Sequence, residues 1–272
     1  MSDFRRRIMM GISTPSGYPD PWVDDGKIWA YYNVTNTEAA TSLLYRTNSV
    51  ATMEVDGVSI TPATSYQFST VGEHLVKYTT SSNNGTNIPD QMFMSVTTLI
   101  RLYMPDTITT MSSTGNGRQF YSCSNLTFVR FSANLESVAY QGFTSCSNLV
   151  VKRLVLPKLT SLDSNCFRYV KIENIVNLGD ITSIPGGYIF ANNSTLKQVT
   201  IPSTVTSIGD RTFNSSGSSC VLTCLAVTPP TLGSNAFSSF SCSKVLVPAS
   251  SVEAYKTAWS GLANKIEAIP TT

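Results

Sequence analysis

The chain has 272 residues, and charged side chains make up only 13% of it, with a net charge of +2. This near-neutral charge argues against a nucleic-acid-binding protein, which needs a clustered basic surface to contact phosphates. The hydrophobic content of 42% argues against intrinsic disorder, whose signature is low hydrophobicity with high net charge. Serine and threonine together supply 70 residues, so small hydroxyl side chains replace many of the charges that a soluble domain usually carries.

Residues 1–26 are expected to form an extended N-terminal arm, because proline and glycine cluster there. Three consecutive arginines, Arg5, Arg6 and Arg7, precede an apolar run that is too short for a secretory signal peptide, so we expect no signal peptide. No apolar run in the chain is long enough for a transmembrane helix. The arginine cluster has two interpretations: a disordered chain start, or an attachment arm that becomes ordered on a partner.

Residues 27–87 contain no repeat and have the pattern of short strands. The strand-like runs are Ile28–Tyr32, Val50–Val55, Ser65–Ser69 and His74–Tyr78. Asp56 and Gly57 lie between apolar runs and predict a two-residue hairpin turn. The sequence therefore predicts a small β-sandwich-like domain that ends in a loop at Ser81–Asn87.

Residues 88–248 repeat with a period close to 24 residues. The phase is set by seven phenylalanines: Phe93, Phe120, Phe143, Phe167, Phe190, Phe213 and Phe237. A repeat of this length, with apolar residues spaced by two and three, is typical of a leucine-rich-repeat solenoid. We predict a mainly β fold whose seven units stack at the strand spacing of about 4.8 Å. The hydroxyl side chains are expected at turns and outward strand positions, bonded locally to the backbone.

Residues 249–272 are predicted to form a helical C-terminal cap. Ser250 and Glu253 have the spacing of a capping box. Tyr255 and Trp259 lie on the apolar face of the same short helix. We expect this aromatic pair to cover the last repeat rather than to bind a ligand.

The repeats resemble the BspA-like leucine-rich repeats of bacterial surface proteins, whose units follow an approximate IP-x-x-V-x-x-IG-x-x-AF-x-x-C-x-x-L pattern. The segments Ile201–Phe213, Gln119–Val129 and Gly142–Val151 match it most closely. The resemblance covers about residues 88–269 and implies a repeat solenoid that adheres to proteins or glycans at a surface. The units after Phe167 and Phe213 depart from the pattern, so local bulges are expected there.

No motif in the chain indicates catalysis, so we expect a protein that is not an enzyme and uses no cofactor or metal. His74 is the single histidine, and any histidine-dependent triad or two-histidine metal site would have to include it. Its strand-like surroundings favour a hydrogen-bonded structural role. The chain also lacks a nucleophile elbow, a phosphate-binding loop of the Walker type and a dinucleotide fingerprint.

The cysteines have two alternative roles. Cys220, Cys224 and Cys242 are candidate zinc ligands, but Cys220 and Cys224 alternate like one face of a strand, so buried thiols are favoured. Cys123 and Cys146 occupy the same phase in adjacent repeats, which places them near disulfide distance if the units stack. We favour free thiols there too, and the alternative of a disulfide stays open.

Four tyrosines close to the repeat phenylalanines, Tyr121, Tyr140, Tyr169 and Tyr188, are candidate contact residues, with packing against the phenylalanines as the alternative. The sequence predicts a non-enzymatic binding or structural module at a virion or extracellular surface. The missing signal peptide favours a phage or prophage component, from the tail or decorating the capsid, attached through the arm. The alternative is a secreted bacterial adhesin of the BspA type. Expected partners are virion or cell-surface proteins, host glycans or further copies of the chain, and neither nucleic acid nor a membrane span.

Overall fold

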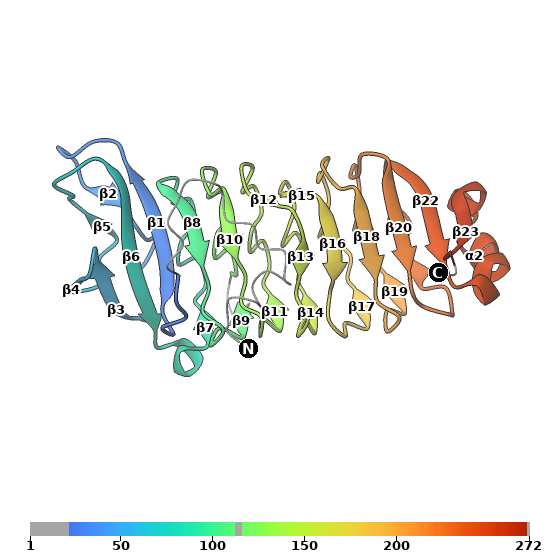
Figure 1. Cartoon of the computed structure of the whole chain (residues 1–272), viewed down its shortest axis with the longest axis horizontal. Coiled ribbons are helices and arrows are strands. Elements are labelled where there is room, and N and C mark those ends of the chain that lie inside the picture. The colour runs from blue at the N-terminus through green and yellow to red at the C-terminus, as the bar shows by residue number, and fades with distance from the viewer. Residues whose placement is uncertain (1–21, 112–115, 271–272) are drawn as a thin grey trace.

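The computed structural model describes residues 22–111 and 116–270, and Arg5, Arg6 and Arg7 lie outside them. The strands lie side by side along one long axis, from β4 and β3 at one end to β23 and the helix α2 at the other (Figure 1). They form a solenoid of about eight turns. The predicted mainly β leucine-rich-repeat fold with a helix near the C-terminus is confirmed.

The first repeats share a sheet with the strands that precede them. In spatial order its strands are β10 (Phe128–Arg130), β8 (Leu99–Tyr103), β1 (Ile28–Val34), β6 (Gly72–Thr80), β3 (Val50–Val55) and β4 (Val58–Ile60). Strand β1 pairs antiparallel with β6 on one side and with β8 on the other. The sheet therefore runs past residue 87 into the repeats, and the proposed division of the chain at that residue does not coincide with an end of the sheet.

The N-terminal end of the solenoid is closed by buried polar and apolar contacts. The β3–β4 hairpin turns at Asp56 and Gly57, whose φ angles of 47° and 86° are those of the predicted two-residue turn. A two-stranded ribbon, β2 (Thr41–Ser42) with β5 (Ser65–Tyr66), lies beside it. The buried Tyr32 hydroxyl donates to the Leu43 carbonyl at 2.8 Å and lies 2.8 Å from the Tyr78 hydroxyl. Burial raises the pKa of both phenols, so this end has a satisfied polar contact within its core.

The remaining strands form parallel ladders along the solenoid. One broad sheet consists of β13 (Leu154–Val155), β16 (Asn174–Asn177), β18 (Gln198–Ile201), β20 (Cys220–Cys224), β22 (Cys242–Val247) and β23 (Ile266–Ala268). A short pair links β12 (Val150–Val151) to β15 (Lys171–Ile172). Two narrow sheets consist of β7 (Asn87–Ile88), β9 (Thr110–Met111), β11 (Ser137–Val138) and β14 (Ser161–Leu162), and of β17 (Ser183–Ile184), β19 (Ser207–Ile208) and β21 (Thr231–Leu232). Strand β7 begins within the segment expected to be a loop, after a 3₁₀ turn at Ser82–Gly85.

The seven repeat phenylalanines stack as a continuous aromatic file inside the solenoid. Neighbouring ring centroids lie 4.9 to 5.8 Å apart. Tyr78 extends the file at one end, 5.7 Å from Phe93, and Trp259 extends it at the other, 5.6 Å from Phe237. The ring spacing follows the strand spacing because each unit advances by one strand along the axis. The 24-residue period thus produces one connected core.

The turns around these phenylalanines form one edge of the solenoid, which we call the phenylalanine edge. Residues two before or two after the phenylalanine have positive φ in most units, among them Arg118, Ser122, Tyr169 and Tyr188. Their backbone N–H groups, and that of the phenylalanine, donate to carbonyls of the following turn, as Arg118 N does to Tyr140 O at 2.8 Å. This hydrogen-bond ladder keeps the turns in register.

Many threonine hydroxyls bond to the preceding turn rather than locally. Thr127, Thr160 and Thr206 each donate through Oγ1 to a backbone carbonyl of the preceding unit, over 2.9 to 3.0 Å. The expectation of local bonding was wrong for these residues, because stacking places a carbonyl of the neighbouring turn within hydrogen-bond reach of the side chain. The hydroxyl content of the sequence therefore contributes to the contact between units.

The C-terminal helix α2 (Val252–Ala258) covers the last turn. The predicted capping box is wrong, since Ser251 is the N-cap residue, makes no side-chain capping bond, and follows Ser250 in a 3₁₀ turn. The Tyr255 hydroxyl donates to the Ala226 carbonyl at 2.7 Å. Trp259 Nε1 donates to the Pro230 carbonyl at 2.9 Å, and its ring packs on Phe237. Both aromatic side chains are buried, as a lid requires.

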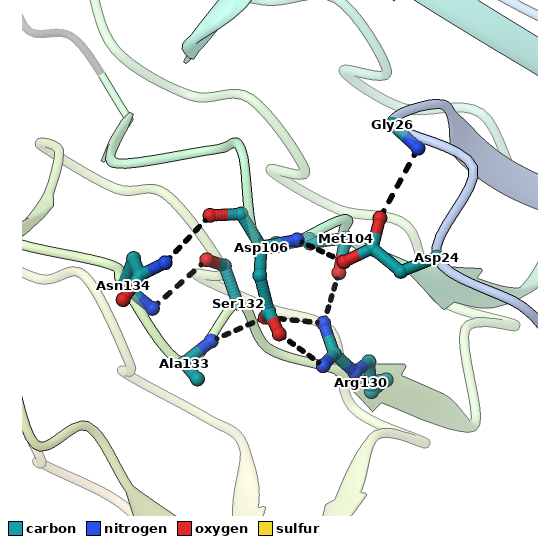
Figure 2. A network of polar contacts seen from close by, with 8 residues as sticks. All are labelled: Asp24, Gly26, Met104, Asp106, Arg130, Ser132, Ala133 and Asn134. Atoms are coloured by element: carbon teal, nitrogen blue, oxygen red, sulfur yellow. Dashed lines mark hydrogen bonds and ion pairs between the residues drawn. The ribbon is translucent and has the colours of Figure 1, made fainter. Parts of the chain in front are cut away.

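The described end of the N-terminal arm is bound to the first repeats through a polar network (Figure 2). The Asp24 carboxylate accepts a hydrogen bond from the Asp106 backbone N–H at 2.8 Å. The Asp106 carboxylate in turn accepts two bonds from Arg130, at 2.8 and 3.0 Å. The Arg130 guanidinium also lies 4.1 Å from the centroid of the buried Trp22 ring. Burial acts to raise the pKa of Asp106, but the hydrogen bonds from Arg130 and Ala133 outweigh it and lower the pKa.

Candidate functional site

The four tyrosines expected to form a contact surface all lie on the phenylalanine edge, and each is paired with an arginine. Arg118 lies over Tyr121 and Tyr140, with its guanidinium carbon 5.7 and 5.8 Å from the ring centroids. Arg168 and Arg211 extend this arrangement along the next turns. We call the set the Arg–Tyr file; its members are Arg118, Tyr121, Tyr140, Arg168, Tyr169, Tyr188 and Arg211. Tyr169 is exposed and the other three tyrosines are half-buried.

The centre of the file is a guanidinium held between two phenol rings. Arg168 lies 4.9 Å from the centroid of Tyr169 and 4.5 Å from that of Tyr188. Arg211 lies 5.6 Å from the centroid of the same Tyr188 ring. Cation–π contacts of this kind fix the plane of a guanidinium. The side chain of Arg168 is therefore oriented before any ligand arrives.

Arg168 has hydrogen-bond donors that the described part of the chain leaves unused. Its Nε is buried and has no acceptor. Its terminal nitrogens make only long contacts, 3.5 Å to Asn165 Oδ1 and 3.4 Å to the Tyr169 hydroxyl. Arg130, by contrast, binds the Asp106 carboxylate through both terminal nitrogens. Because the Nε is shielded from solvent, the terminal nitrogens are the donors that a ligand can use, and their long contacts leave them able to bind a carboxylate or hydroxyl partner.

Tyr169 and Tyr188 adopt backbone conformations that suit other residues better. Their φ angles are 61° and 62°, in the left-handed region that bulky residues rarely occupy. Positions of this kind elsewhere on the edge carry residues such as Asn165, Asn192 and Ser215. The left-handed conformation costs an L-residue about 1–2 kcal/mol. Arg118 and Arg211 of the file share this conformation, with φ angles of 60° and 57°, and strain of this kind clusters at functional sites.

The polar neighbours of the file are amides rather than carboxylates, with one exception. Arg118 Nε donates to Gln141 Oε1 at 2.7 Å, and Arg46, next to the first repeat, donates to Gln91 Oε1. Arg211 pairs with Asp210 at 2.9 Å. Among these arginines of the described edge, only Arg211 forms an ion pair with a carboxylate.

Sequence patterns identified the tyrosines of this surface but not its arginines. Arg118 and Arg211 lie two residues before a repeat phenylalanine, and Arg168 lies one residue after one. That phase relationship was the available signal, because residues at equivalent phases of a solenoid lie on the same edge.

The remaining candidate sites have structural roles in the described residues. His74 Nδ1 lies 2.6 Å from Asp56 Oδ2, and its Nε2 lies 3.0 Å from the Thr70 carbonyl oxygen, as expected of a hydrogen-bonded strand histidine. Cys220, Cys224 and Cys242, the candidate zinc ligands, are buried free thiols. In residues 22–111 and 116–270 no group of three or more histidine, cysteine or acidic side chains is arranged to hold a metal ion.

Cys123 and Cys146 contribute to the contact between turns. The Cys123 thiol donates to the Phe93 carbonyl at 2.9 Å, and the Cys146 thiol donates to the Phe120 carbonyl at 3.0 Å. In a later unit the Ser216 hydroxyl makes the equivalent bond. The two cysteines are free and buried, and burial raises the pKa of Cys123 to about 12. They act as buried hydrogen-bond donors rather than as reactive groups.

We expect all six thiols to be unreactive in the folded protein. Each is buried, and burial raises the pKa of each thiol, so almost no thiolate exists at pH 8. Titration with Ellman's reagent at pH 8 should detect no fast-reacting thiol in the native protein and all six after denaturation. A fast native reaction would show that a thiol is exposed, and two fewer thiols in denaturant would reveal a disulfide, whose partners peptide mapping would identify as Cys123 and Cys146 or another pair.

The fold and this edge define the class of the protein as a leucine-rich-repeat solenoid, and comparison with known families makes the assignment specific. The family described as BspA type leucine rich repeat region matches in six copies, over residues 35–150, 114–245 and 186–269. The chain belongs to this family. A search of curated protein sequences gave no match. No helix within the described ranges is long and apolar enough to cross a membrane.

Two solved structures are similar to this chain. A leucine rich cell surface protein from Faecalibacterium prausnitzii is 22% identical over 86% of this chain and 56% of its own, with a TM-score of 0.51. A leucine-rich repeat protein from Bacteroides ovatus is 13% identical over 60% of this chain and 58% of its own, with a TM-score of 0.35. The chain thus spans little more than half the length of either protein. The first likeness agrees with the solenoid fold.

Proposed function

We propose that this chain is a non-enzymatic binding module and that the Arg–Tyr file is its working surface. The observation that carries the proposal is Arg168, whose guanidinium lies over the rings of Tyr169 and Tyr188 while its terminal nitrogens make only long contacts. Arginine and tyrosine are also the residue types that contribute most to binding energy at protein surfaces. Two tyrosines held at unfavourable φ angles add support, because folding alone does not call for tyrosine there.

We further propose that the module works at a surface. The description of the Faecalibacterium prausnitzii relative as a cell surface protein supports a bacterial cell surface. The virion role, with attachment through Arg5, Arg6 and Arg7, stays a prediction that none of the comparisons supports. Mass spectrometry of purified phage particles and of surface proteins released from intact cells distinguishes the two settings: detection in particles favours the virion component, and detection only on cells favours the adhesin.

The double substitution Tyr169→Asn/Tyr188→Asn tests the working surface. Asparagine adopts positive φ more readily than tyrosine, and this gain offsets the lost cation–π contacts with Arg168. We expect the free energy of unfolding to change by less than about 1 kcal/mol, and binding to the ligands recognised by the wild-type chain on glycan and protein arrays to be lost.

Val150→Asn is the matched control, because Val150 is exposed on strand β12 and does not belong to the Arg–Tyr file. This variant should keep wild-type binding. If the double variant retained every array signal of the wild type, or if the wild type bound nothing on either array, the Arg–Tyr file would not be the working surface.

A further inference from the structure

We infer that the ligand of the Arg–Tyr file is a linear glycan that carries carboxylate groups. This inference rests on the proposed function and adds the chemical class of the ligand. Three features of the edge support it: the unused donors of Arg168, the tyrosine rings beside them, and the spacing of the arginines along the solenoid.

A carboxylate fits the central guanidinium. The planar fork of arginine donates two parallel hydrogen bonds to a carboxylate, and such charge-assisted bonds are about twice as strong as neutral ones. Asn165 and the Tyr169 hydroxyl contact Arg168 only at 3.5 and 3.4 Å, so a carboxylate would not have to displace a strong partner. Arg211 already pairs with Asp210 at 2.9 Å, so a ligand carboxylate would have to compete with Asp210 there. Arg168 is therefore the preferred position for the acidic group.

The side chains next to the guanidiniums suit a sugar ring. The Tyr169 side chain is 45% exposed, and an aromatic ring offers an apolar face with a polar hydroxyl at its tip. Gln141 bonds to Arg118, and Asn165 lies beside Arg168. Their amides supply both donors and acceptors for hydroxyl groups. A uronic acid combines the hydroxyls and the carboxylate that this set of side chains can bind.

The arginines recur with a spacing that favours a polymer. Arg118, Arg168 and Arg211 belong to the units of Phe120, Phe167 and Phe213, so they lie on every second turn. At the strand spacing, every second turn corresponds to about 10 Å along the axis. This is close to the length of an extended disaccharide, so a glycan with one acidic sugar in two can place successive carboxylates opposite successive arginines.

The shape of the file favours a glycan over a folded protein. A stable protein interface covers about 800 Å² on each partner and has an apolar centre. The Arg–Tyr file is narrow, because each turn contributes only one or two side chains to it, and serines and asparagines such as Ser122, Ser145 and Asn192 alternate with its members on the edge. A linear chain of sugars can follow such an edge along its length.

Titration calorimetry of the full chain at low salt tests this inference with three acidic glycans as probes: polygalacturonate, alginate and hyaluronan. Each is compared with its methyl-esterified form, which keeps the sugars and removes the charge. We expect at least one acidic glycan to bind and its ester to bind at least about tenfold more weakly. Arg168→Gln should weaken binding by a similar factor, and Arg168→Lys, which keeps the charge without the fork, by less. Arg153→Gln, at an exposed arginine next to strand β12, should leave binding unchanged.

Several outcomes would overturn the inference: no acidic glycan binds, the acid and the ester bind equally, or folded Arg168→Gln and Arg168→Lys both bind like the wild type. Binding of the Tyr169→Asn/Tyr188→Asn variant on the glycan and protein arrays shows whether the glycan inference alone fails or the proposed working surface fails as well. If the chain binds an acidic protein in a manner that depends on Tyr169 and Tyr188, the inferred glycan ligand is wrong, and the Arg–Tyr file is still the working surface. If no ligand depends on those tyrosines, both proposals are wrong.

Discussion

Phe167→Ala is expected to lower the free energy of unfolding by about 3–5 kcal/mol, a large part of the stability of an ordinary domain. Phe167 is fully buried, and its ring lies nearly parallel to those of Phe143 and Phe190, with centroids 5.5 and 5.8 Å away. The hydrogen-bond ladders hold the neighbouring turns at the strand spacing, so the flanking rings cannot move together to fill the gap. The cost of a cavity is highest where the surroundings cannot collapse. Denaturant unfolding followed by circular dichroism measures the change.

Phe167→Leu is the control for this prediction. Leucine fills most of the volume and removes the flat ring, so we expect a loss below about 2 kcal/mol. If the alanine variant lost no more than the leucine variant, the turns must be able to close around the gap. The aromatic file would then be less important for stability than its continuity suggests.

The periodic part of the chain was the part most accessible from sequence. The spacing of the phenylalanines predicted the stacked units because each unit repeats the same local interactions, and the phase of a residue specifies its place on the solenoid. Proximity to the repeat phenylalanines also made Tyr121, Tyr140, Tyr169 and Tyr188 candidate contact residues. The arginines of the file lie equally close to the phenylalanines, two residues before one in two units and one residue after one in the third, so the same signal was available for them.

What sequence could not predict depends on contacts between segments far apart in the chain. The antiparallel pairing of β1 with β8 joins the N-terminal strands to the repeats, and each strand alone has the pattern of any half-buried strand. The ion pair of Arg130 with Asp106 connects two units, and Asp24 joins it from outside the repeats. The donors left unused on Arg168 are likewise a property of what surrounds it, which only the assembled turns reveal.

Trp259→Ala is expected to expose the last turn and to lower the free energy of unfolding by about 3–5 kcal/mol. The buried Trp259 ring packs on Phe237 and on Tyr255, with centroids 5.6 and 4.9 Å away. Its Nε1 also donates to the Pro230 carbonyl at 2.9 Å. Removing the ring leaves one side of the aromatic file open to water and the Pro230 carbonyl without its donor. A solenoid unit is stabilised by its neighbours, so the loss should fall mainly on the turns next to the cap.

Hydrogen exchange measured by mass spectrometry locates this loss. In Trp259→Ala the amides of β20, β22 and β23 should exchange faster, while those of β1 and β6, at the opposite end, should keep their wild-type rates, because local opening begins where neighbours are missing. Trp259→Phe keeps an aromatic ring on Phe237 and loses the Nε1 hydrogen bond. It should lower the free energy of unfolding by less, about 1–3 kcal/mol, and keep the amides of β22 protected from exchange. Uniformly faster exchange along the whole chain would instead mean that the solenoid unfolds as one cooperative unit and that Trp259 acts on all of its turns rather than as a local lid.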